Sequence, residues 1–169
     1  WTYMYMPGEA GLLNTVFSLF GIEPYIWLQD ARLAIVWIVV TMTWSGMGGT
    51  ILMYFAALQG INPDLYEAAA IDGAKIRHKL RFIVLPELYP IMLLLFVRQI
   101  IGVFQVMEQP LTMTGGGPNG ATESLALLAY KYAFEYLKFD KGMATGVITF
   151  LILIVMTLFY TRLEKKVNR

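Results

Sequence analysis

Three long stretches with almost no charged residues dominate this 169-residue sequence. Residues 33–58 and 143–161 contain no charged side chain, and residues 88–107 contain one, Arg98. An α-helix needs about 20 apolar residues to cross the hydrocarbon core of a membrane, at ~1.5 Å per residue. The whole chain is 57% hydrophobic and 15% charged, whereas soluble domains average about 45–50% and about 25%. The sequence therefore predicts an all-α membrane protein with about three transmembrane helices.

The positions of lysine and arginine predict which connections face the cytoplasm. The segment 59–87 and the C-terminal tail each hold four basic residues, which are Lys75, Arg77, Lys79 and Arg81, then Arg162, Lys165, Lys166 and Arg169. The three lysines of segment 108–142 are offset by acidic residues, and only Arg32 precedes the first span. We therefore expect 59–87 and the C-terminus to be cytoplasmic and 108–142 to be an outer loop. The chain begins at Trp1 without a signal peptide, so we also expect further spans upstream.

Several kinds of site are excluded by composition. The chain has no cysteine and one histidine, and its net charge is +1. Thiolate and multi-histidine metal centres are thus ruled out, and nothing indicates a nucleic-acid partner. The glycine-rich run at residues 114–120 lacks the lysine of a phosphate-binding loop. No nucleophile–base pair can be assembled, so we expect neither catalytic residues nor a cofactor.

The segment 59–87 carries unusually clear helix signals for a connection between spans. Asn62 is suited to the N-cap and Pro63 to the first helical position. The tract from Glu67 to Ile71 favours a helix, and Gly73 is placed as its C-terminal stop. A second helix with the basic residues is expected up to Leu85-Pro86. From the residues alone, a helix that docks in a partner's groove and a merely solvated connector stay equally open.

The same segment resembles the EAA motif of ABC-importer permeases. That motif reads E-A-A, three residues, G, nine residues, I-x-L-P, and it is matched here by Glu67, Ala68, Ala69, Gly73, Ile83, Leu85 and Pro86. The flanks 58–63, 71–74, 114–118 and 139–142 resemble sugar-type permeases, in particular the maltose type. The resemblance covers nearly the whole chain. It implies the C-terminal half of a six-span type I permease core, in a single domain of residues 1–169.

The resemblance also implies a mechanism and partners. The helix around Glu67 would be a coupling helix in a cleft of a cytoplasmic ATP-binding-cassette ATPase dimer. Glu67 would be its polar anchor, Ala68 and Ala69 its packing face, and Gly73 the turn to the next helix. Further implied partners are a second permease subunit, membrane lipid and an extracytoplasmic sugar-binding protein. The implied location is a bacterial or archaeal inner membrane.

A polar stripe in the second apolar stretch is the candidate transport path. Arg98 and Gln105 are seven residues apart and share a helical face, and Gln109 is expected to extend it. A charge in a span costs about 2.5–3.5 kcal/mol near the bilayer centre, so it should face a bundle or cavity. Cavity lining and structural pairing both remain open for Arg98, and Gln105 suits a sugar contact better.

Smaller features complete the expectations. A short interfacial helix is predicted at residues 12–20, with Trp27 and Trp37 at the outer headgroup level. Thr122 is predicted to cap a helix over residues 124–137 that is too short to span. Glycines in two spans indicate close helix packing, at Gly46, Gly48 and Gly49 and at Gly142 and Gly146. For the first group a hinge that lets the helix bend stays open as the alternative.

Two alternatives stay open. The same permease class could carry glycerol phosphate or another solute. A secondary transporter or channel fragment would belong to a different class, which should show coupling-ion carboxylates in its spans; the three apolar stretches hold none.

Overall fold

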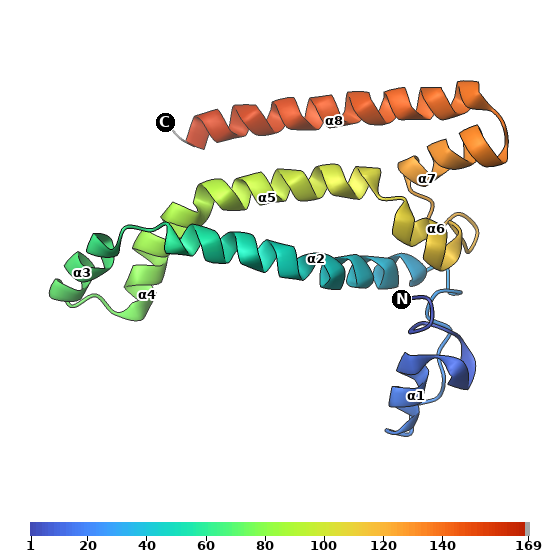
Figure 1. The fold of residues 1–169 in the computed structure, drawn as a ribbon, viewed down its shortest axis with the longest axis horizontal. Coiled ribbons are helices and arrows are strands. Elements are labelled where there is room, and N and C mark those ends of the chain that lie inside the picture. Colours follow the sequence, from blue (N-terminus) through green and yellow to red (C-terminus); the bar gives the residue numbers. More distant parts are fainter. Residues whose placement is uncertain (168–169) are drawn as a thin grey trace.

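Three long helices lying side by side form the body of the protein (Figure 1). The computed structural model describes the backbone of residues 1–167 and the side chains as far as Arg162. In this part of the chain all regular structure is helical. Helices α2 (Ala34–Gln59), α5 (Leu85–Gln105) and α8 (Phe139–Val167) are the long ones. Each includes a segment long and apolar enough to cross a membrane, as the sequence predicted.

The long helices bury little of their apolar surface within this chain. Only 11%, 11% and 6% of the most apolar stretch of α2, α5 and α8 is buried. Large side chains such as Trp44, Phe96 and Phe159 are more than 60% exposed. In water such surfaces would be strongly unfavourable, so they are suited to lipid or to other helices.

Short elements gather at the two ends of the long helices (Figure 1). One end carries α3 (Pro63–Ile71) and α4 (Ile76–Lys79), near the C-terminal end of α8. The other end carries the N-terminal segment with η1 (Gly8–Ala10) and α1 (Leu12–Ser18), together with α6 (Glu108–Thr114) and α7 (Leu125–Tyr130). The two segments richest in basic residues thus share an end; the side chains of Lys165, Lys166 and Arg169 lie outside the described residues.

Two π-helical turns lead into long helices. The turn η2 (Leu80–Val84) joins α4 to α5, so that residues from Ile76 to Gln105 form one 30-residue helix. The sequence had suggested that Leu85-Pro86 separates a second short helix from the span. The turn η3 (Lys131–Glu135) follows α7 and precedes α8, which begins at Phe139.

A buried cluster joins the N-terminal segment to α2 and α6, and several of its residues are aromatic. Trp27 is 8% exposed and packs edge-on against Trp37, with ring centroids 4.7 Å apart. Its indole Nε1 donates to Asn14 Oδ1 at 2.8 Å, and Asn14 is 1% exposed. Asn14 Nδ2 in turn donates to the carbonyls of Gly8 and Tyr25. Trp27 is therefore buried in this cluster. Its expected position at the headgroup level of the membrane had not suggested such burial.

The predicted N-cap at Thr122 is wrong. Ser124 caps α7, because its Oγ accepts the amide N–H of Leu127 at 3.1 Å. The Ser124 hydroxyl also donates to the Val106 carbonyl at the end of α5. Thr122 is instead 2% exposed and donates to the Gly117 carbonyl at 2.8 Å. Serine and threonine both cap helices well. Thr122 does not cap α7 because its hydroxyl bonds to the glycine-rich turn instead.

Candidate functional site

Helix α3 begins and ends as its sequence predicts. Asn62 Oδ1 accepts the amide N–H of Asp64 at 3.0 Å, and Pro63 occupies the first turn. At the other end Gly73 has φ +69°, a conformation that glycine adopts without a steric penalty. Two backbone bonds close this end, from Gly73 N to Ala70 O and from Ala74 N to Ala69 O. This is the Schellman arrangement, which stops a helix sharply and satisfies its last carbonyls.

The side chains of α3 leave an open face at the tip of the structure. Glu67, Ala68 and Ala70 are exposed, and Ala69 is half-buried. Among the described residues, no hydrogen bond or ion pair engages the Glu67 carboxylate. Ile71 is 88% exposed, which is unusual for an isoleucine in contact with water. A small, partly apolar face with one free carboxylate is suited to a complementary groove on another protein.

A hydrogen bond ties α3 to the helix that follows it. Lys79 Nζ donates to the Tyr66 carbonyl at 3.3 Å, across the turn at Gly73. Directly after Lys79 comes the π-helical turn, in which the amide N–H of Leu85 bonds to the Leu80 carbonyl. Ile83 is half-buried within that turn, whereas Leu85 and Pro86 follow it and are exposed. The structure thus places the predicted motif residues in two groups, one on α3 and one at the start of α5.

The basic side chains of α4 and the π-helical turn surround an exposed aromatic ring. Phe82 is 68% exposed, and the His78 ring stacks on it with an interplanar angle of 10°. The Arg81 guanidinium lies 5.7 Å from the centre of the same ring. This face of α4 is positive, while α3 carries the acidic Asp64, Glu67 and Asp72.

A cavity of about 330 Å³ lies between α2, α5 and the segment from Ala121 to Leu125. Its walls are mostly apolar and include Ile38, Met42 and Phe104. Polar groups from three elements reach it, namely Thr43 of α2, Gln99 of α5, and Thr122, Glu123 and Ser124. An apolar space with a few polar groups is the usual form of a binding pocket for a small molecule.

The predicted polar stripe is only partly realised. Arg98 is exposed and its Nη1 lies 3.6 Å from Met53 Sδ on α2, outside the cavity. Gln105 is the last residue of α5, and the backbone becomes extended at Val106. The prediction that Gln109 extends the same face is therefore wrong, because Gln109 belongs to α6 and the helix direction changes before it. Sequence reasoning missed Gln99 and Thr43, although uncharged polar residues in apolar spans were the available signal.

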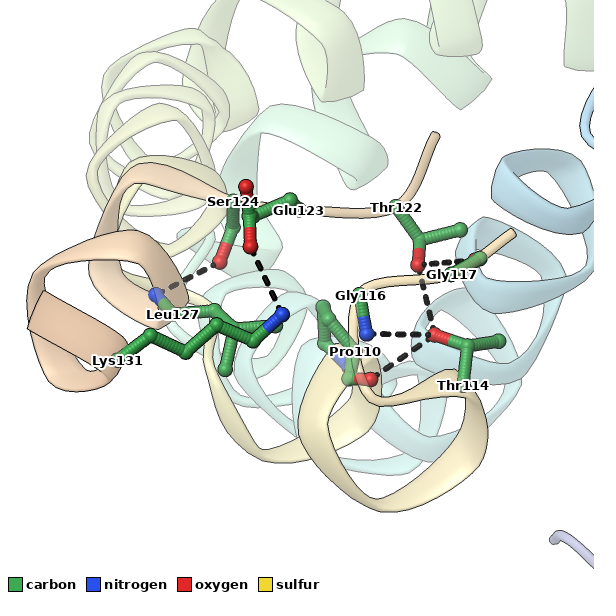
Figure 2. Close-up of polar contacts among 9 residues, drawn as sticks. All are labelled: Pro110, Thr114, Gly116, Gly117, Thr122, Glu123, Ser124, Leu127 and Lys131. Carbon is green, nitrogen blue, oxygen red and sulfur yellow. Dashed lines mark hydrogen bonds and ion pairs between the residues drawn. The ribbon is translucent and has the colours of Figure 1, made fainter. Parts of the chain in front are cut away.

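The glycine-rich segment at residues 114–120 is held by a compact set of polar contacts (Figure 2). The hydroxyls of Thr114 and Thr122 are 2.6 Å apart, and the Gly116 amide N–H donates to Thr114 Oγ1 at 3.3 Å. Lys131 Nζ lies 2.8 Å from Glu123 Oε1. This charged hydrogen bond from the Glu123 side chain raises the pKa of Lys131. The segment is therefore an ordered cap over the α2–α5 cavity.

No group of three His, Cys, Asp or Glu residues that would hold a metal ion occurs among the described residues.

Comparison with known proteins places the chain in a family. Residues 2–169 match the family model described as "Binding-protein-dependent transport system inner membrane component". The trehalose/maltose transport system permease protein MalF of Thermococcus litoralis is 34% identical over 165 residues, which are 98% of this chain and 55% of the relative. The lactose transport system permease protein LacF of Rhizobium radiobacter is 32% identical, over 92% of this chain and 55% of the relative.

A solved structure shares the fold. It is the crystal structure of a bacterial ABC transporter involved in the import of the acidic polysaccharide alginate, with a TM-score of 0.87 at 21% identity. The match covers 99% of this chain and 59% of that chain. The chain thus spans about half the length of the curated relatives it matches.

Proposed function

Because the chain belongs to the family of binding-protein-dependent transport system inner membrane components, we propose that it is part of the transmembrane permease subunit of an ATP-driven sugar importer. The names of two relatives support sugar as the solute class. One is named as a trehalose/maltose transport permease and the other as a lactose transport permease. The importer is expected to receive its sugar from an extracytoplasmic binding protein. A related alginate transporter has been crystallised in complex with a periplasmic protein that holds an alginate pentasaccharide.

The observation that carries the proposal is the sharply bounded helix α3 at one end of the long helices. Its two ends are closed by Asn62 and Gly73, so its length and direction are defined without a partner. In the proposed function α3 sits in a cleft of an ATPase subunit, with Glu67 as its charged anchor. ATP-driven closure of the ATPase dimer then draws α3 and its counterpart on a second permease subunit together. The long helices follow, and the cavity changes the side to which it opens.

The proposed orientation puts α3, α4 and the C-terminus in the cytoplasm. The count of lysine and arginine favours this orientation. The arrangement in space is compatible with it, because α3, α4 and the C-terminal end of α8 lie at the same end of the long helices, opposite α6 and α7 (Figure 1). The cap at Thr114–Lys131 would then face the binding protein outside.

Glu67→Lys tests the coupling role of α3. The substitution replaces the exposed carboxylate by a cation, which would repel a basic groove residue of the ATPase subunit. We expect sugar uptake by the assembled transporter to fall at least about tenfold, equivalent to ~1.4 kcal/mol or more. The fall would be measured as uptake of labelled sugar and as sugar-stimulated ATPase activity in proteoliposomes.

Asp72→Lys provides the matched control for Glu67→Lys. Asp72 is also an exposed acidic residue, at the end of the same helix and about 140° around its axis. A lysine there is compatible with the helix dipole. Retained uptake in Asp72→Lys beside lost uptake in Glu67→Lys supports the coupling role. Equal, normal activity in both variants contradicts it.

The substrate path is proposed to run beside α5, either along Arg98 and Gln105 or through the cavity that Gln99 lines. Sugars offer several hydroxyl groups, and a lost hydrogen bond costs about 0.5–1.5 kcal/mol. We expect Gln105→Ala to raise the KM for uptake up to about tenfold with little change in protein level. Transport kinetics of Arg98→Ala, Gln99→Ala and Gln105→Ala would measure this. If only Gln99→Ala raises the KM, the path lies in the cavity and the stripe is structural.

A further inference from the structure

The second half of the matched motif coincides with an irregularity in a helix. Residues from Ile76 to Gln105 form one continuous helix, and within it Leu80–Val84 is a π-helical turn. The amide N–H of Leu85 bonds five residues back, to the Leu80 carbonyl, instead of four. Ile83 lies inside this turn, and Leu85 and Pro86 follow it directly.

Pro86 gives a local reason for the turn. Proline has no amide N–H, and in an uninterrupted α-helix its ring would press on the carbonyl four residues earlier, that of Phe82. Helices accommodate such a residue by a kink or by a single π-helical turn. The exposed positions of Phe82, Leu85 and Pro86 leave room for this widening.

The π-helical turn changes the direction in which the side chains of α4, and with them α3, point relative to α5. A π-helical turn contains one residue more than an α-helical turn. Each residue of an α-helix advances the chain by about 100° and ~1.5 Å. Without the added residue, α4 would be rotated by about 100° around the axis of α5. Because α3 is attached through the turn at Gly73, its exposed face would point in another direction.

The hydrogen bond between Lys79 and Tyr66 couples the rotation of α4 to the position of α3. Lys79 is the last residue before the π-helical turn, and its Nζ donates to the Tyr66 carbonyl in the middle of α3. Tyr66 is adjacent to Glu67, so a rotation of Lys79 around α5 displaces the proposed anchor. This hydrogen bond links α3 to α4 in addition to the connecting residues 72–75.

We propose that the π-helical turn at Leu80–Val84 is a rotational adapter, and that Lys79 is the positioning residue that transmits its setting to α3. The adapter aims the Glu67–Ala69 face at the groove of the ATPase subunit. The proposal rests on the proposed function. It assigns a role to Ile83, Leu85 and Pro86, which is to keep the π-helical turn and so fix the rotation of α4 relative to α5. Contact with the ATPase subunit is made by α3.

Deletion of Phe82 tests the adapter. Phe82 is 68% exposed, so its removal takes little from the protein interior, and the turn is left with the residue count of an α-helix. We expect sugar uptake by the assembled transporter to fall at least about a hundredfold. We also expect a thiol introduced by Ala70→Cys, at an exposed position of α3 next to the docking face, to lose its protection from a maleimide by the ATPase subunit.

A compensated variant separates residue count from residue identity. It carries the deletion of Phe82 together with one alanine inserted between Lys79 and Leu80. The register of Lys79 relative to Pro86 is then restored, although the sequence of the turn is altered. Recovery of uptake and of maleimide protection supports the adapter. A compensated variant as inactive as the deletion overturns it, because the Phe82 side chain would then be the requirement.

Lys79 has its own pair of variants. Lys79→Met removes the donor to Tyr66 and should lower uptake several-fold while the subunit stays in the membrane. Lys79→Arg keeps a donor and should recover most of the activity. Equal activity of Lys79→Met and the unmodified transporter overturns the positioning role.

The outcomes also separate this inference from the proposed function. Normal uptake by the Phe82 deletion beside inactive Glu67→Lys overturns the adapter and leaves the coupling role of α3 standing. Normal uptake by both overturns the coupling role as well. If the deletion variant does not reach the membrane, insertion of one alanine between Lys79 and Leu80 alone tests a rotation of the same size, about 100°, in the opposite sense. Normal uptake by that insertion variant overturns the adapter.

Discussion

Gly73→Arg is expected to abolish sugar uptake while the subunit remains in the membrane. Gly73 has φ +69°, and a side chain in this left-handed region costs about 1–2 kcal/mol. No atom lies within 4 Å of the position of an added Cβ, so packing within the chain does not oppose the substitution. The damage comes instead from the altered end of α3, because arginine, unlike asparagine, is disfavoured in the left-handed region that position 73 requires. Uptake should fall by at least two orders of magnitude.

Gly73→Asn is the matched control for that prediction. Asparagine tolerates the left-handed region, and in this chain Asn119 adopts φ +52°. It adds no charge and little bulk, so most of the uptake should be retained. Immunodetection in membranes would show whether both variants are inserted, and proteoliposome uptake would show their activity. Normal transport by Gly73→Arg would contradict a docking role for this end of α3.

Gly142→Leu is expected to lower the stability of the subunit strongly. Gly142 lies near the start of α8 and is buried against α7 and η3. An added Cβ would lie 3.0 Å from Ala133 Cβ and 3.1 Å from the Ala129 carbonyl oxygen. A leucine must therefore push α8 away from α7, and overpacking of this kind costs about 1–3 kcal/mol or more. We expect less subunit in the membrane and a Tm several degrees lower in detergent.

Gly146→Leu is the control for this effect. It lies one turn further along α8, and nothing in the described structure is within 4 Å of its added Cβ. The apolar leucine suits a surface that faces lipid, so the Tm should change little, by the equivalent of about 0.5 kcal/mol or less. Equal Tm values for Gly142→Leu and Gly146→Leu would show that the contact between α7 and α8 does not contribute to the stability of the subunit.

The comparison of these two glycines illustrates what a single sequence cannot distinguish. Both were predicted to pack, since both are small residues in an apolar helix. Among the described residues, an added Cβ at Gly142 meets another helix, whereas one at Gly146, Gly46, Gly48 or Gly49 has no atom within 4 Å. Contacts of this kind depend on how distant segments are brought together, which a local pattern does not contain.

The candidate site divides in the same way. The beginning and end of α3 were predictable, because Asn62, Pro63 and Gly73 act on backbone groups a few residues away. The π-helical turn, the bond from Lys79 to Tyr66 and the cavity beside Gln99 were not, because each depends on a contact or a register that several residues set jointly. The roles of Glu67, Ala68 and Ala69 in coupling remain predictions.

The sequence by itself determined that this is an all-helical membrane protein with three long apolar helices, and where its best-capped short helix begins and ends. Length, apolarity and capping are local properties, and each is readable from a few neighbouring residues or from one continuous stretch. Only the tertiary structure decided that Ser124 caps α7 in place of Thr122 and that Gln109 leaves the face of α5. It also decided that, among the described residues, Gly142 contacts another helix and Gly146 does not. These outcomes depend on which surfaces meet in space, and that is settled by the packing of the whole chain.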